Sequence, residues 1–373
     1  KRQRLAIALA IALRPPLVIA DEPTTSLDVA VAGQVMAALR ELCEELGSAL
    51  LLISHDLAMA HRWCERMAVL DGGRVVEINR SDVVLTYPSS RVGQRLLTAA
   101  RAREGGSTPE PPEASTVLAV QELRCWHNLG GPPWNPTWLK AVDGISFELK
   151  AGETLGVVGG SGCGKSTLCR ALMGLTPVRG GRVQLLGHDL LRLRGRRAHQ
   201  VRRTIQMVFQ DPLACLNPAM SVVDAIADPL LIHHLATPSA AREQARRLME
   251  RVGLVPAERY QNRLPRQLSG GQQQRVAIAR SLALKPKVLI CDESVSMLDA
   301  EIQAEVLALL RQLQRDLGLA MIFITHDLSV ASGFCHRLLV LNKGHVVEEG
   351  PGDRLLNQPV SYTHLRAHET STD

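Results

Sequence analysis

Residues 159–166 read Gly159-Gly160-Ser161-Gly162-Cys163-Gly164-Lys165-Ser166, a complete G-x-x-x-x-G-K-[ST] sequence. The apolar run 154–158 before it predicts a buried strand, and the segment 167–172 after it, which starts with Thr167, predicts a helix. In such a unit the backbone N–H groups of the glycine-rich turn close around phosphate oxygens, and the N-terminal end of the helix faces the same anion. Lys165 adds a charge for the β- and γ-phosphates, and Ser166 offers a hydroxyl to Mg²⁺. The chain is therefore predicted to bind a nucleoside triphosphate.

The sequence also contains an internal repeat at a constant offset of 271 residues, as from Asp21 to Asp292. Residues 2–74 align with residues 273–345 without a gap. The offset keeps polar residues in register, pairing Glu22 with Glu293, Asp28 with Asp299 and His55 with His326. A fixed offset over about seventy positions indicates duplicated domains. The first copy is expected to be incomplete, because its equivalent of residues 159–166 would lie upstream of Lys1.

Composition restricts the classes of protein to which the chain can belong. Its 373 residues suffice for two domains with separate cores, and 46% of them are hydrophobic. The longest apolar stretch, residues 5–13, is too short to span a bilayer. The 8 cysteines are scattered without a C-x-x-C pair, which argues for reduced thiols rather than zinc sites or disulfides. A net charge of +6 favours a solvated basic surface over a site for nucleic acid or anionic lipid.

A change in composition separates the two copies. Residues 99–116 are rich in Gly, Ser, Pro and Glu without an apolar period, and therefore predict a flexible linker. The expected domains are residues 1–98, the C-terminal part of the first copy, and residues 117–358, the complete second copy. Residues 359–373 depart from the pattern of both copies and are interpreted as an atypical tail, for which a non-native origin is one explanation.

The second copy has the sequence pattern of an α/β fold with a parallel sheet. Residues 288–291 and 320–325 are short apolar runs that predict buried strands. Between them, residues 300–317 carry apolar side chains on one helical face and end at Gly318. The pattern predicts strands and helices in alternation around a phosphate-binding loop.

Polar residues follow both predicted strands. Asp292 and Glu293 follow the first strand and His326 the second, and ligands of open parallel sheets bind beyond such carboxyl ends. An acidic pair at this place predicts that Asp292 lies in the magnesium shell and that Glu293 orients and deprotonates the attacking water. His326 is interpreted as a γ-phosphate sensor, because its equivalent His55 also follows an apolar run.

A further segment favours one family. Leu268-Ser269-Gly270-Gly271-Gln272 precedes a helical stretch, and a serine with two glycines at a helix N-terminus forms a second anion site. Together with the phosphate-binding loop, Gln210, the pair Asp292-Glu293 and His326, in that order, it resembles the ATP-binding subunit of ABC transporters. The resemblance covers nearly the whole chain apart from the linker and the tail.

The resemblance implies an α/β P-loop NTPase core with a helical signature subdomain and an antiparallel β subdomain, with ATP and Mg²⁺ as cofactors. Residues 159–167 would be the Walker A loop, and Glu293, His326 and Gln210 the catalytic residues. Leu268 to Gln272 would be the signature, whose residues 269–272 bind the partner domain's nucleotide. Ser166, Gln210 and Asp292 would hold the metal. The first-copy equivalents are Asp21, Glu22, Asp28 and His55. For the aromatic residue that stacks on adenine, Trp126 is the candidate and Trp138 the alternative, and either could instead be a packing residue.

One segment is similar to a particular branch of this family. Residues 209–218 read Phe-Gln-Asp-Pro-Leu-Ala-Cys-Leu-Asn-Pro, as in oligopeptide, dipeptide and nickel importers, and residues 87–97 resemble that branch's C-terminal extension. The resemblance implies the fused form of two paired ATPase subunits that energise import of peptides, or else of nickel or glutathione. The implied partners are inner-membrane permease subunits, a second ATPase domain in a head-to-tail dimer and, indirectly, an extracytoplasmic solute-binding protein. The implied location is peripheral, on the cytoplasmic face of the membrane.

A soluble twin ATPase that acts on ribosomes or nucleic acid is the alternative. The arginine cluster at residues 192–203 would support it, but such a run is typical of a solvated face. The long charged inter-domain segment of ribosome-binding relatives is not found in the sequence, nor are the zinc-binding cysteine pairs of DNA-damage ATPases. No nucleic acid partner is expected.

Overall fold

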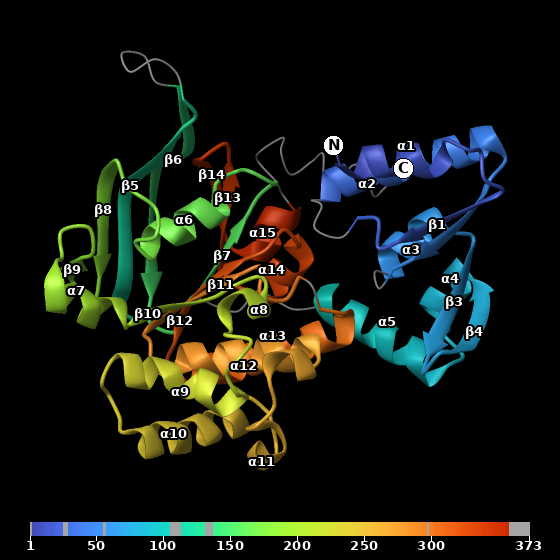
Figure 1. Cartoon of the computed structure of the whole chain (residues 1–373). Coiled ribbons are helices and arrows are strands. Elements are labelled where there is room, and N and C mark those ends of the chain that lie inside the picture. Colours follow the sequence, from blue (N-terminus) through green and yellow to red (C-terminus); the bar gives the residue numbers. More distant parts are fainter. Residues whose placement is uncertain are drawn as a thin grey trace. The chain divides into compact units, whose positions relative to one another are not determined.

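The computed structural model describes residues 2–24, 29–54, 57–104, 113–130, 137–296 and 298–357. It divides into two compact units: an N-terminal unit centred on residues 1–105 and a C-terminal unit built mainly from residues 106–298 and 305–361. Figure 1 shows the N-terminal unit in blue and cyan and the C-terminal unit in green to red.

The C-terminal unit is built around a six-stranded sheet in the order β10-β11-β12-β7-β13-β14. The first five strands are parallel, and β14 is antiparallel to β13. The strands are β7 (Thr154–Val158), β10 (Ile205–Val208), β11 (Val288–Asp292), β12 (Ala320–Ile324), β13 (Arg337–Asn342) and β14 (His345–Gly350). Every residue of β7, β11 and β12 is buried, as in central strands that are covered on both faces.

A second, antiparallel sheet lies beside this core, and helix α6 (Lys165–Leu172) packs between the two sheets. The strand order of the antiparallel sheet is β6-β5-β8-β9, with β5 (Thr116–Asn128), β6 (Trp138–Lys150), β8 (Gly180–Leu185) and β9 (His188–Asp189). Leu168 of α6 belongs to one apolar cluster with Phe147 of β6 and Ile322 of β12. Helix α6 is therefore fixed between the two sheets by apolar contacts, and the loop that precedes it is held at its C-terminal end.

Helices form the rest of the C-terminal unit. Figure 1 shows three of them grouped together: α9 (Val222–Ile232), α10 (Pro238–Arg251) and α12 (Gly270–Leu282). On the core sheet, Phe323 of β12 packs against Phe334 of α14 with ring centroids 4.8 Å apart. The other helices are α7 (Gly195–Arg202), α8 (Pro212–Cys215), α11 (Ala257–Tyr260), α13 (Ala300–Leu317), α14 (Leu328–Phe334), α15 (Gly352–Asn357) and a 3₁₀ turn at Pro265–Gln267.

The predicted fold class is confirmed, and most predicted elements lie where the sequence placed them. The strand predicted at 154–158 and the helix predicted at 300–317 match β7 and α13 at both ends. Helix α5 (Arg91–Glu104) reaches into the predicted linker 99–116, and β5 begins at Thr116. Residues 105–112 of that linker and the predicted tail 359–373 lie outside the described residues.

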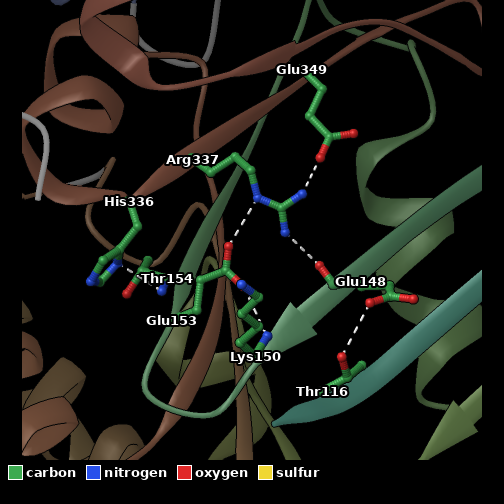
Figure 2. A network of polar contacts seen from close by, with 8 residues as sticks. All are labelled: Thr116, Glu148, Lys150, Glu153, Thr154, His336, Arg337 and Glu349. Carbon is green, nitrogen blue, oxygen red and sulfur yellow. Dashed lines mark hydrogen bonds and ion pairs between the residues drawn. The ribbon is translucent and has the colours of Figure 1, made fainter. Parts of the chain in front are cut away.

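A buried carboxylate holds the end of the core sheet opposite the phosphate-binding loop (Figure 2). Glu153, 1% exposed, accepts hydrogen bonds from Arg337 Nε at 2.9 Å and from the backbone N–H of Lys150 at 2.8 Å. The same guanidinium donates to the carbonyl oxygen of Glu148 at 2.6 Å and to the carboxylate of Glu349. Arg337 thereby joins the start of β7 and β13 to the ends of β6 and β14.

Removal of the buried Glu153 carboxylate should destabilise the C-terminal unit. Glu153→Ala is expected to lower the free energy of unfolding by about 3–5 kcal/mol, because it leaves the charge of Arg337 partly buried without its main partner. Urea denaturation followed by circular dichroism measures the change. The matched control is Glu349→Ala, which removes a partner whose side chain is 36% exposed, and it should cost less than about 1 kcal/mol. Equal losses in the two variants would contradict the role given to Glu153.

The described residues of the N-terminal unit form two separate pairs of strands. The parallel pair is β1 (Leu17–Asp21) with β2 (Ala49–Ile53), and the antiparallel pair is β3 (Arg66–Asp71) with β4 (Arg74–Arg80). The helices are α1 (Arg2–Ile11), α2 (Val29–Leu46), α3 (Leu57–Trp63), α4 (Ser81–Thr86) and α5. A cluster of Val18, Ala20, Met36, Leu39 and Cys43 forms a small core between β1 and α2.

The two units share local geometry at the offset of 271 residues seen in the sequence. Leu17 pairs with Ala49 in β1–β2, as Val288 pairs with Ala320 in β11–β12. The equivalent strands β1 and β11 differ in burial, however. Ile19 is 60% exposed, whereas its equivalent Ile290 is 0% exposed in the core of the C-terminal unit.

Candidate functional site

Close approaches at two glycines shape the phosphate-binding loop, residues 159–166. Gly159 has a φ of 150°, and a Cβ there would lie 2.3 Å from the carbonyl oxygen of Leu341. Gly164 has a φ of 111°, and a Cβ there would lie 2.1 Å from the carbonyl oxygen of Ala141. Both positions therefore require glycine. The loop passes the backbones of β13 and β6 in direct contact before it enters α6.

Lys165 lies at the start of α6 with its side chain turned back onto the loop. Its ammonium donates to the carbonyl oxygens of Gly159 at 2.6 Å and Gly160 at 3.2 Å, and the residue is only 7% exposed. The outer part of the loop is exposed at Gly160, Ser161 and Gly162, whereas Cys163 and Gly164 are buried. Ser166 is exposed and Thr167 half-buried on the first turn of the helix. A lysine held this way places a positive charge inside the loop, where phosphate oxygens can compete for it.

Asp292, the last residue of β11, is a buried carboxylate with one oxygen unsatisfied. Its Oδ1 has no hydrogen-bond partner among the described residues. Burial and the neighbouring charge of Glu293 raise the pKa of Asp292, and a hydrogen bond from Ser166 opposes this effect. A hard cation would remove this electrostatic cost, so the donor set of one carboxylate and one hydroxyl fits Mg²⁺, whose remaining ligands are usually water and phosphate oxygens. The described residues contain no group of three His, Cys, Asp or Glu that could hold a metal by protein ligands alone.

Glu293 is the residue at which three predicted catalytic side chains meet. Its Oε2 accepts a hydrogen bond from Gln210 Nε2 at 3.0 Å, and its Oε1 lies 3.8 Å from His326 Nδ1. Its backbone is left-handed, with φ of 44°, and its N–H donates to the carbonyl oxygen of Ile324. The segment that starts at Ser296 is part of the family pattern, but the sequence assigned Ser296 itself no role; its hydroxyl donates to the carbonyl oxygen of Glu293 at 2.8 Å and supports this strained turn.

These contacts set the charges of the site. The contact with His326 lowers the pKa of Glu293 below its ordinary value, and the contact with Glu293 raises the pKa of His326. The positive charge of Lys165 also favours ionisation of Glu293. Glu293 is therefore a carboxylate at neutral pH and can accept a proton from water.

The predicted signature residues begin a different helix. Ser269 caps α12: its hydroxyl accepts from the backbone N–H of Gln272, whose side chain accepts in return from the N–H of Ser269 at 3.1 Å. Ser269 and Gly270 are exposed, and Gly271 is buried. Helix α12 is grouped with α9 and α10, and α6 lies apart from that group (Figure 1). The first turn of α12 is therefore capped by its own side chains and exposed at Ser269 and Gly270.

The two tryptophans considered for adenine lie on adjacent strands. Trp126 of β5 is half-buried, and its Nε1 donates to Asp143 at 3.2 Å. Trp138 of β6 lies under the guanidinium of Arg179, which is 4.0 Å from the ring centroid. Neither contact decides which ring receives a base, so the choice of Trp126 stays a prediction.

The first-copy equivalents are described only in part. Asp21 is exposed at the end of β1, and Glu22 follows it with a φ of 45°. Asp28 and His55 lie outside the described residues.

Comparison with known proteins gives the class of the C-terminal unit. A dimeric structure of the ATP-binding cassette MJ0796 bound to ADP and Pi matches with a TM-score of 0.56 and 29% identity, and covers 63% of this chain and 98% of the cassette. CbiO1 of Clostridium perfringens, part of the ABC transporter complex cbiONQ, matches with a TM-score of 0.56 and 28% identity, and covers 69% of this chain and 96% of that one. The fold with its phosphate-binding loop is that of an ATP-binding cassette.

Sequence comparison identifies the family. The ABC transporter family model matches residues 142–296. An uncharacterized ABC transporter ATP-binding protein, YejF of Escherichia coli, is 42% identical over 96% of this chain and 68% of its own length. The glutathione import ATP-binding protein GsiA of Pectobacterium atrosepticum is 38% identical, and the peptidoglycan transport ATP-binding protein YejF of Agrobacterium fabrum 39%. The chain spans 61% and 65% of the lengths of these two relatives. The chain belongs to the ATP-binding proteins of ABC transporters, which are ATPases.

Lys165 provides the first test of the site. Lys165→Ala should weaken binding of Mg-ATP by at least about a hundredfold, because the phosphates lose their main positive charge. Titration with a fluorescent ATP analogue measures the affinity. Lys150→Ala is the control, because Lys150 lies beside Glu153 at the opposite end of β7 from the loop, and it should leave the affinity unchanged. Equal affinity of the Lys165 variant and the parent protein would rule out this loop as the binding site.

The contact between Glu293 and His326 predicts a change in titration. Glu293→Gln should lower the pKa of His326, because the group that raises it most is removed and burial, which favours the neutral ring, remains. Nuclear magnetic resonance of the histidine rings follows the titration, with His326→Asn to assign the signal. His336, whose pKa burial lowers, is an internal reference and should not change. An unchanged pKa of His326 would show that the two side chains do not interact in solution.

Proposed function

We propose that this chain is the ATPase of a membrane importer and that Glu293, Gln210 and His326 carry out ATP hydrolysis in its C-terminal unit. The observation that carries the proposal is the meeting of these three side chains beyond the ends of β10, β11 and β12. Glu293 accepts the proton of the attacking water, Gln210 orients the carboxylate, and His326 contacts the transferred γ-phosphoryl group. Ser166, Gln210 and Asp292 would hold Mg²⁺, which would supply positive charge to offset that of the phosphates.

The base and the phosphates are bound by different parts of the unit. Lys165 and the backbone N–H groups of residues 159–166 bind the phosphates, and Trp126 stacks on the adenine. Ser269, Gly270, Gly271 and Gln272 contact a nucleotide that is held by the phosphate-binding loop of a second cassette, in a head-to-tail dimer. The exposed start of α12 supports this arrangement, and so does the dimeric state of MJ0796.

The N-terminal unit is proposed to be part of a second cassette, fused in the same chain. The shared strand register supports a duplication, as do the matching φ values of Glu22 and Glu293 and the matching hydrogen bonds from their N–H groups to Ile53 and Ile324, both 3.0 Å. The proposed division is residues 1–98, a linker at 99–116, residues 117–358 and a tail at 359–373.

The importer drives solute across a membrane through permease subunits that this ATPase moves between two states. The names of the relatives support import and favour peptide-like solutes, since one imports glutathione and another transports peptidoglycan. Peptides are therefore the proposed solute class, ahead of nickel, and an extracytoplasmic binding protein delivers them. The described residues include no helix long and apolar enough to cross a membrane. The proposed location is the cytoplasmic face of the membrane, bound to the permease.

Glu293 provides the test of the chemistry. Glu293→Gln should keep Mg-ATP affinity within about threefold and lower turnover by at least about a hundredfold, because the amide still accepts a hydrogen bond but cannot take a proton. Phosphate release at saturating ATP measures turnover. The matched control is Glu305→Gln. The carboxylate of Glu305 lies in α13 and pairs with Arg275 at 2.9 Å, so this variant should hydrolyse ATP at the parental rate. Near-parental turnover of the Glu293 variant would remove it as the base.

Purification tests the importer against the ribosomal alternative. A tagged chain expressed in its own host and extracted with detergent is expected to co-purify with integral-membrane permease subunits. ATP turnover of that complex should rise when the solute-binding protein and a peptide are added. Recovery of ribosomal proteins in place of permeases would contradict the importer.

A further inference from the structure

Asp143 joins several side chains around the ring of Trp126. Its carboxylate accepts from Trp126 Nε1 at 3.2 Å and pairs with Lys140 Nζ at 3.2 Å and with Arg124 Nε at 3.7 Å. Lys140 Nζ also lies over the Trp126 ring, 4.9 Å from its centroid. Burial opposes ionisation of Asp143, whose side chain is 15% exposed, but Lys140 and Trp126 hold its pKa below the ordinary value. The carboxylate of Asp143 therefore holds the Nε1 edge of the Trp126 indole and keeps the ammonium of Lys140 over one face of the ring.

The same segment lies directly against the phosphate-binding loop. Trp126 pairs with Lys140 in the register of β5 and β6. The next residue, Ala141, presents the carbonyl oxygen that Gly164 approaches. The backbone N–H of Asp143 donates to Gly344 at 2.9 Å, and the N–H of Gly344 donates in turn to Cys163 of the loop at 2.9 Å. Backbone contacts through Ala141 and through Gly344 thus connect the segment around Trp126 with the phosphate-binding loop.

We propose that Asp143 is a positioning residue for the nucleotide base: it fixes the plane of the Trp126 indole and keeps Lys140 on one face, so that the base stacks on the other face. This inference rests on the proposed role of Trp126 as the adenine platform. A ring held in one orientation loses less freedom when a base stacks on it, so its contribution to affinity is larger. Asp143 acts on the base alone and leaves phosphate binding to residues 159–166.

Binding of two ligands by the full chain separates base binding from phosphate binding. Asp143→Ala should weaken Mg-ATP about tenfold, the scale of one stacked base, and leave Mg-tripolyphosphate, which has no base, within about twofold. Isothermal titration calorimetry measures both affinities. Trp126→Ala should show the same pattern, and the double variant should bind ATP no more weakly than Trp126→Ala alone.

Asp189 offers a matched control in the same sheet. Its side chain is 18% exposed and pairs with Arg182 at 3.3 Å and Arg192 at 3.5 Å, so Asp189→Ala also removes a half-buried carboxylate with two cationic partners. It should leave both affinities unchanged.

Four results would overturn the inference, and they differ in what they imply. Equal weakening of ATP and tripolyphosphate in Asp143→Ala would mark a general effect on the fold. Losses that multiply in the double variant would show that Asp143 acts independently of Trp126. An unchanged ATP affinity of Asp143→Ala together with a weakened Trp126→Ala would defeat the positioning role alone, whereas no effect of either variant would also remove Trp126 as the base platform.

Discussion

The common direction of β10, β11 and β12 is the constraint on which the rest of this structure depends. Because the three strands are parallel neighbours, the residues just beyond their carboxyl ends meet at one edge of the sheet. Gln210 reaches Glu293 across 83 residues of sequence, and His326 approaches the same carboxylate from the other side. The left-handed backbone of Glu293 turns its side chain into this position, and the hydrogen bond from its N–H to Ile324 holds the turn. The pairing of these three parallel strands therefore brings Gln210, Glu293 and His326 together.

Several polar groups at this edge of the sheet contact one another. The ammonium of Lys165 uses the carbonyl oxygens of its own loop, and Glu293 uses Gln210 and His326. Asp292 differs, since one of its oxygens has no partner among the described residues and its pKa is raised. A triphosphate with its cation would exchange the loop carbonyls for phosphate oxygens and relieve the charge at Asp292. Ser166, the last residue of the loop, already donates a hydrogen bond to Asp292, so its hydroxyl links the loop to the carboxylate that such a cation would contact.

The sequence predicted the parts of this site that are encoded locally. The apolar runs at 154–158 and 288–291 and the one-sided helix at 300–317 depend on neighbouring residues only, so their positions could be read directly. Asp292, Glu293 and His326 followed from their places after such runs. The contacts of Gln210 with Glu293 and of Asp143 with Trp126 could not be read, because they depend on strand register and side-chain direction. The end of α5 at Glu104 was also missed, because residues 99–104 were assigned to the linker by its overall composition.

The central claim is that the phosphate-binding loop and the acidic pair at the end of β11 form one metal–nucleotide site. Electron paramagnetic resonance tests it most directly, with Mn²⁺ in place of Mg²⁺ and a non-hydrolysable ATP analogue. The account predicts a single tightly bound Mn²⁺ per chain that appears only with the nucleotide, and an affinity at least about tenfold lower in Asp292→Asn. Asp189→Asn should bind the ion like the parent protein. Equal Mn²⁺ binding by the parent protein and the Asp292 variant would contradict the account.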